Sequence, residues 1–156
     1  TATRADAASG SQLYRIYSAA VPSGTTADIV ITVGGNSGRC AIMWGIGYPN
    51  SATKLGGGTG TATGTSNVVH SISDTVQENG GFILAIGGRH DTLGTATWTW
   101  GGADAITEDV DTQIESTASY SFAHINLTED VTNDLTFAFS VSATKTMAWA
   151  SWGASA

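Results

Sequence analysis

The sequence predicts an all-β protein, an antiparallel β-sandwich of about eight or nine strands with a jelly-roll-like arrangement. Three observations support this prediction. Apolar and polar residues alternate with a period of two in several short segments, which is the pattern of strands with one buried face. Gly, Asn and Ser separate these segments, as turn residues do. Finally, no segment keeps a helical period over three turns.

The clearest alternation occurs in four segments, "ADIVITVGG", "RCAIMWGIGY", "GGFILAIGG" and "DLTFAFSVSA". Further strands are expected at residues 13–21, 67–73, 95–100, 120–127 and 146–152. The segment "TEDVDTQIES" opens with a capping-like Thr and is compatible with one short turn of helix. The residues that we expect in the core are Ile31, Trp44, Leu84, Phe137 and Phe139.

The length of 156 residues fits a single β-sandwich domain over residues 1–156. A chain of this size buries roughly 70% of its extended surface, so it can build a core without cross-links. We expect residues 1–11 to form an extended N-terminal arm. Residues 50–66 are rich in Gly and predict a loop at one end of the sandwich.

Charge and cysteine content exclude several function classes. The net charge is −7, and the six Lys and Arg residues are scattered, so we expect no nucleic-acid partner. The single cysteine, Cys40, lies in an apolar strand and is expected to be a buried, unreactive thiol. No run approaches the roughly 20 apolar residues of a membrane-spanning helix, so we expect no membrane partner. No segment predicts a cofactor.

The motif TEDV occurs twice, at residues 107–110 and 128–131. Calcium takes about 6–8 oxygen ligands, and neither run matches the helix-loop-helix calcium pattern. We therefore expect turns in which Thr, Asp and Asn cap their own backbone, and no bound metal. A structural cation remains the alternative, and its weak candidate ligands are Asp109, Asp111, Asp130 and Asp134.

Two tryptophans, Trp98 and Trp100, share one face of a predicted strand. Such a pair can belong to the core, or it can form an aromatic platform for sugar rings or a protein interface. The sequence leaves both interpretations open.

The order of four segments carries a resemblance. "AVPSGTTADIVITVGGNSGRCAIMWGI", "GGFILAIGG", "ATWTWGGADAITEDVD" and "LTFAFSVSATKTMAWASWGA" together resemble small β-sandwich domains of tailed-bacteriophage structural proteins, of capsid-decoration, head-fibre or tail-fibre type. The resemblance covers most of the chain and lies in strand patterns. It implies a place on the virion surface and brings no catalytic residues.

Three functions compete at this stage. The first is a non-enzymatic virion structural protein that assembles with capsid or tail proteins as a homo-oligomer. The second is a carbohydrate-binding module that recognises a host-surface glycan through Trp98 and Trp100. The third is a hydrolase, which we disfavour because no nucleophile–base pair is visible in the sequence. We expect the first function.

Overall fold

A computed structural model describes residues 3–9, 12–18, 55–70, 81–90, 98–101, 106–115, 118–127, 135–140 and 142–153. Within these residues all regular structure is β-strand, and no helix is present. The strands are β1 (Thr3–Ser9), β2 (Gln12–Ser18), β3 (Gly56–Ala62), β4 (Val68–His70), β5 (Phe82–His90), β6 (Trp98–Gly101), β7 (Thr107–Glu115), β8 (Ala118–Asn126), β9 (Leu135–Phe139) and β10 (Lys145–Trp152).

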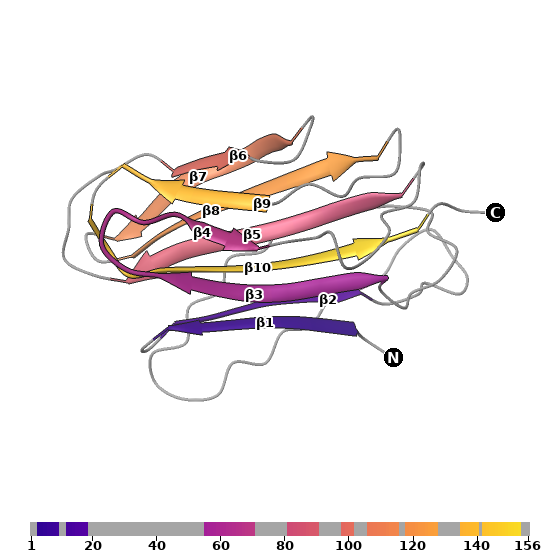
Figure 1. Ribbon diagram of the computed structural model, residues 1–156, viewed down its shortest axis with the longest axis horizontal. Coiled ribbons are helices and arrows are strands. Elements are labelled where there is room, and N and C mark those ends of the chain that lie inside the picture. Colours follow the sequence, from indigo (N-terminus) through magenta and orange to yellow (C-terminus); the bar gives the residue numbers. More distant parts are fainter. Residues whose placement is uncertain are drawn as a thin grey trace.

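Eight of these strands form the two sheets of a sandwich. The five-stranded sheet has the order β3-β10-β5-β8-β7, and the three-stranded sheet has the order β4-β9-β6 (Figure 1). Every described strand pair is antiparallel. The prediction of an all-β antiparallel sandwich is therefore confirmed. A separate hairpin of β1 and β2 adds a further pair of strands.

The connectivity of the sandwich is nested. β3 pairs with β10, β4 with β9 and β5 with β8, so that strands early in the chain pair with strands late in it. The successive pairs alternate between the two sheets, and β6 and β7 are the innermost strands of the nest. The three outer pairs follow the order of a jelly roll, in which one long hairpin folds over itself to make two packed sheets. The innermost strands depart from this order, because they do not pair with each other: β6 pairs with β9 in one sheet and β7 pairs with β8 in the other.

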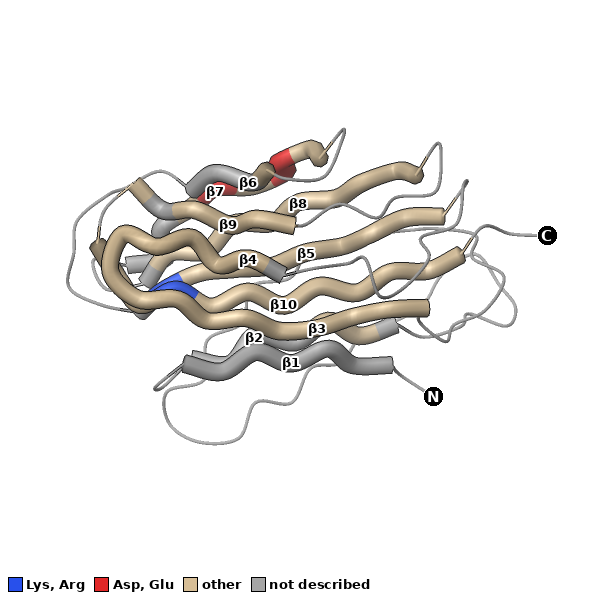
Figure 2. The backbone as a smooth tube through the Cα atoms, in the orientation of Figure 1, with Lys and Arg blue, Asp and Glu red and all other residues tan. Residues whose placement is uncertain are grey.

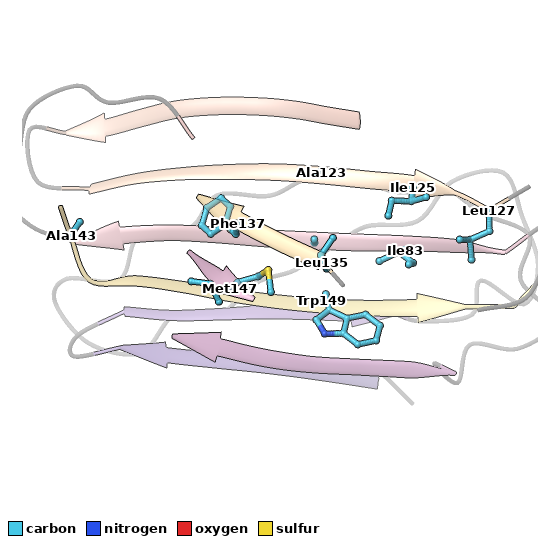
Figure 3. Close-up of a cluster of buried hydrophobic side chains, with 11 residues drawn as sticks. Ile83, Ala123, Ile125, Leu127, Leu135, Phe137, Ala143, Met147 and Trp149 are labelled. Carbon is cyan, nitrogen blue, oxygen red and sulfur yellow. The ribbon is translucent and has the colours of Figure 1, made fainter. Parts of the chain in front are cut away.

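The five-stranded sheet is buried on both faces at its central strands, β10 and β5. Its inner face packs against the three-stranded sheet, and this cluster includes Ile83, Trp149 and, from β9, Phe137 (Figure 3). Its outer face forms a second cluster, in which Trp152 packs together with Ile16 of the β1–β2 hairpin. The sequence predicted one buried face for the strand at "GGFILAIGG". That prediction is wrong for β5. The alternation placed Phe82, Leu84 and Ile86 on the buried face, and the hairpin covers this face. Ile83 and Ala85, on the face that we expected to be solvent-exposed, are buried against the three-stranded sheet.

The burial of the side chain is described for two of the five residues predicted in the core. Phe137 is fully buried, and Leu84 is partly buried against the outer cluster. The backbone of Phe139 lies in β9, but its side chain is outside the described part of the structure. Ile31 and Trp44, together with the strands predicted around them, also lie outside the described residues.

The sequence predicted a loop over the Gly-rich residues 50–66, but part of this segment is a strand. Gly56–Ala62 form β3, which pairs with β10 along its whole length. Glycine is favoured here by packing, because a Cβ at Gly60 would lie 2.7 Å from Cγ1 of Val68 on β4. Gly60 therefore lets β3 and β4, at the edges of the two sheets, approach each other closely.

The segment "TEDVDTQIES" does not form a helical turn. Thr107–Glu115 form β7, the edge strand that pairs with β8. The register shifts between Glu108 and Val110 and again between Gln113 and Glu115, so β7 contains two β-bulges. Each bulge inserts one residue and breaks the period of two, which explains why the sequence pattern did not identify the strand.

The expected N-terminal arm is partly described. Thr3–Ser9 form β1, which runs antiparallel to β2 with Thr3 opposite Ser18 and Ser9 opposite Gln12. The hairpin lies over the outer face of the five-stranded sheet, where β1 packs on β3 and β10 and β2 packs on β5 and β10.

Candidate functional site

The most specific polar arrangement outside the core is a pair between Asp109 and His124. Nδ1 of His124 lies 2.9 Å from each of the two carboxylate oxygens of Asp109. Both side chains are about one-third exposed, at 30% for His124 and 29% for Asp109. The pair joins β7 to β8 at the acidic edge of the five-stranded sheet.

A β-bulge makes this pair. Glu108 is opposite Ala123 and Val110 is opposite Phe122, so Asp109 is the extra residue of β7 at this point. A bulge residue has no partner in the ladder and its side chain is redirected. As a result the Asp109 carboxylate reaches His124, which stands opposite Thr107.

The other two carboxylates of this run occupy the opposite face of β7. Glu108 and Asp111 are opposite Ala123 and Ser121, which share the inner face of β8. Desolvation raises the pKa of the Glu108 carboxyl above its ordinary value, and the negative charge of Asp111 raises this pKa further. The three acidic residues are thus divided between two faces of one strand.

This division bears on the cation hypothesis. Among the residues that the structure describes, no group of three or more His, Cys, Asp and Glu side chains converges as a metal site would require. Asp109 and Asp111 lie on different faces, and both oxygens of Asp109 already face His124. Asp130 and Asp134 of the second TEDV run lie outside the described residues.

The chemistry available to the pair is limited but definite. A carboxylate that accepts a hydrogen bond from Nδ1–H holds the imidazole in one tautomer, with Nε2 as the acceptor. Such an imidazole can accept a proton or a hydrogen bond from an approaching group. The sequence did not identify this pair, since the two residues are 15 apart and only the β7–β8 register brings them together.

Two basic residues lie inside the sandwich. Arg89 and Lys145 are fully buried, and desolvation lowers the pKa of each below its ordinary value. Nζ of Lys145 donates a 2.7 Å hydrogen bond to the carbonyl oxygen of Gly64 in the turn after β3. This bond ties the start of β10 to the β3–β4 connection, which is a structural role.

Trp98 and Trp100 lie on β6, an edge strand of the three-stranded sheet. The register pairs Trp98 with Phe139 and Trp100 with Phe137, which is fully buried. The side chains of both tryptophans lie outside the described part of the structure. Their role as core, glycan or interface residues stays a prediction.

The two edges of the five-stranded sheet differ strongly in charge. The edge at β7 carries four acidic residues, Glu108, Asp109, Asp111 and Glu115. At the other edge, residues 55–69 contain no Asp, Glu, Lys or Arg, and we call them the neutral flank. Figure 2 shows acidic residues in red on β7, whereas β3 is tan and β4 carries no red or blue.

The neutral flank is accessible. Thr59 and Thr61 of β3 are exposed, and the neighbouring Gly58 and Gly60 are partly exposed. Two apolar side chains at the ends of the flank are also exposed, namely Leu55 at 42% and Val69 at 53%. Accessible, uncharged surface of this kind is typical of the centre of a protein interface.

Comparisons with known proteins assign no family: no protein-family model matches the chain, and neither a curated protein nor a solved structure is significantly similar to it. Within the described residues there is no helix long and apolar enough to span a membrane.

Proposed function

We propose that this chain is a non-enzymatic structural protein of a virion, which decorates a capsid or forms part of a head or tail appendage by protein–protein assembly. The observation that carries the proposal is the contrast between the two edges of the five-stranded sheet. One edge is acidic and contains two bulges, whereas the neutral flank is uncharged and its strand is regular.

Edge strands explain why this contrast matters. An exposed edge offers unpaired N–H and C=O groups to any passing strand, and proteins block unwanted pairing with charges and bulges. β7 has both of these protections. β3 has neither, since its register with β10 runs without a shift from Gly56 to Ala62. Among the residues that the structure describes, no strand pairs with the outer edge of β3, and an edge without charges or bulges is suited to pairing with another chain.

The virion assignment is an analogy of fold and sequence pattern. Jelly rolls serve as viral capsid domains, but they also serve as lectin domains, so the architecture alone does not decide between assembly and glycan binding. The resemblance to tailed-bacteriophage structural domains favours the virion. Under this proposal the protein resides on the virion surface, its partners are other virion proteins, and it forms a homo-oligomer.

The test is direct binding to particles. We expect the purified chain to sediment with emptied or undecorated phage particles, and antibodies against the chain to label intact particles in electron micrographs. A chain that binds no virion component, and shows enzymatic turnover instead, would overturn the proposal. Glycan-array binding that is lost in Trp98→Ala, in the absence of particle binding, would establish the carbohydrate-binding function in its place.

A further inference from the structure

We infer that the neutral flank is a self-association surface, on which β3 of one copy pairs antiparallel with β3 of a second copy. The inference rests on the proposed assembly function and names the partner of one surface. Such pairing would join two five-stranded sheets into one continuous sheet across a two-fold axis. The argument depends on the backbone of β3, on charge, and on the second edge strand beside it.

The backbone of β3 has N–H and C=O groups that point away from β10 and can bond to a second strand. In an antiparallel sheet alternate residues direct their N–H and C=O groups to opposite sides of the strand, so half of these groups on β3 point away from β10. The ladder with β10 is regular over Gly56–Ala62, which keeps this outward row evenly spaced. Gly57, Gly58 and Gly60 have no side chains and are partly exposed, so the backbone of β3 is partly accessible.

Charge favours a second copy at this edge over every other described edge of the sheet. Each chain has a net charge of −7, so two copies repel each other over most of their surface. β7 would bring four acidic residues against four more, and like charges directly opposite each other destabilise a strand pair. β3 brings no charge to the contact.

The sequence of β3 is compatible with a two-fold axis. Its central residue is Thr59, and pairing about this residue places Thr59 opposite Thr59 of the second copy and Gly58 opposite Gly60. All seven residues of β3 are then paired. Three of the four residues of β3 on the inner face of the sheet are glycines, which have no side chains that would hold the chains apart.

The neighbouring strand enlarges the contact. β4 is an edge strand of the three-stranded sheet, and Gly60 and Val68 show how closely β3 and β4 approach. The two sheets therefore present their edges side by side, with Val69 exposed on β4. A stable dimer needs about 1,000 Å² or more of buried surface, and this second edge supplies apolar area beyond the β3 ladder.

The experiment measures mass in solution by light scattering for three proteins. We expect twice the chain mass of 15.9 kDa for the natural protein. Thr59→Lys places like charges opposite each other at the two-fold axis and should reduce the mass to that of one chain. Thr107→Lys makes the same change at an exposed position of β7 and should leave the dimer intact. Circular dichroism and thermal melting establish that all three are folded.

Cross-linking tests the register. With Cys40, the only cysteine, replaced by Ser, Thr59→Cys should form a disulfide between two copies, because directly opposed residues lie within disulfide reach. Thr61→Cys is the matched control. In the proposed register its two copies are four residues apart along the strand, roughly 13 Å, and should not link.

Three results would overturn the inference: a natural protein that is monomeric at every concentration, a dimer that persists in Thr59→Lys, or equal cross-linking at positions 59 and 61. A larger oligomer that is unaffected by Thr59→Lys would reject the β3 interface and leave the assembly function standing. A monomer that binds particles only while Thr59 is unchanged would assign the edge to a different virion protein. A monomer that binds no particle would reject both proposals.

Discussion

The ring of Phe137 occupies the space that a side chain at Gly87 would need. Phe137 projects from β9 onto the inner face of β5 (Figure 3), and a Cβ added at Gly87 would lie nearest to Cε1 of the ring, 2.5 Å from Cζ and 2.6 Å from Cδ1. The two residues lie 50 apart in the chain and belong to different sheets. This contact therefore fixes how the two sheets of the sandwich face each other.

Gly87→Ala should destabilise the protein by about 1–3 kcal/mol, because the added methyl group overpacks a core that has no room for it. Denaturant unfolding of the purified variant measures the change. Phe137→Leu in the Gly87→Ala background removes part of the ring and should recover some of the loss relative to the two single changes. Equal, additive losses would show that the two sites are independent.

Phe137→Ala should cost about 3–5 kcal/mol of unfolding free energy, because the fully buried ring leaves a cavity between the sheets. Val110→Ala on β7 is the control, since its side chain is 38% exposed and its loss should cost well under half as much. A cost at Phe137 no larger than the cost at Val110 would contradict the sandwich core described here.

Glu108→Gln should stabilise the protein at neutral pH. The pKa of Glu108 is raised in the folded state by desolvation and by Asp111, so the folded chain holds this proton to a higher pH than the unfolded chain does. Stability is therefore lost as the pH rises from about 4.3, the ordinary value for Glu, through the raised folded pKa. We expect a higher melting temperature for the variant at pH 7 and no difference below about pH 4. A lower melting temperature of the variant at pH 7 would contradict the prediction that the ionised Glu108 carboxylate destabilises the folded protein.

Asp109→Asn, in contrast, should slightly lower the free energy of unfolding at pH 7. The change weakens the pair with His124, and a pair with both side chains about one-third exposed contributes at most about 1 kcal/mol. Chemical unfolding at pH 7 measures the loss. The comparison with Glu108→Gln is informative, because neutralising adjacent carboxylates on opposite faces of β7 should change stability in opposite directions.

Neither TEDV run should bind calcium tightly. Calorimetry should detect no sub-micromolar calcium binding, and a chelator should leave the melting temperature unchanged. The reason at the first run is that Asp109 faces His124 while Glu108 and Asp111 lie on the other face of the strand. Tight binding that disappears in Asp109→Ala would contradict this expectation.

Much of the fold could be predicted from the sequence because strand alternation is a local property. The segments around Phe82, Leu135 and Trp152 have the predicted strands, and Trp149 and Trp152 point to opposite faces of β10, as their spacing of three requires. A period of two follows from the geometry of one strand, so no other part of the chain is needed to recognise it.

Three features were decided only by the tertiary structure. The composition of Gly56–Ala62 indicated a loop, but these residues form a strand because they pair with β10. The close approach of Val68 explains why one of them, Gly60, is a glycine. β7 escaped recognition because its two bulges interrupt the alternation. β5 is buried on both faces because the N-terminal hairpin covers the face of Leu84 and Ile86, while the three-stranded sheet covers the face of Ile83; the β5 sequence does not specify which segment covers which face.

The same division holds for the candidate surfaces. The sequence by itself determined the net charge, the absence of charge over residues 55–69 and the cluster of carboxylates at Glu108–Asp111. Only the tertiary structure decided that β3 and β7 are the opposite edges of one sheet, and that Asp109 reaches His124. Sheet order and bulge geometry depend on hydrogen bonds between strands far apart in the chain, which leave no local signal in the residues that they bring together.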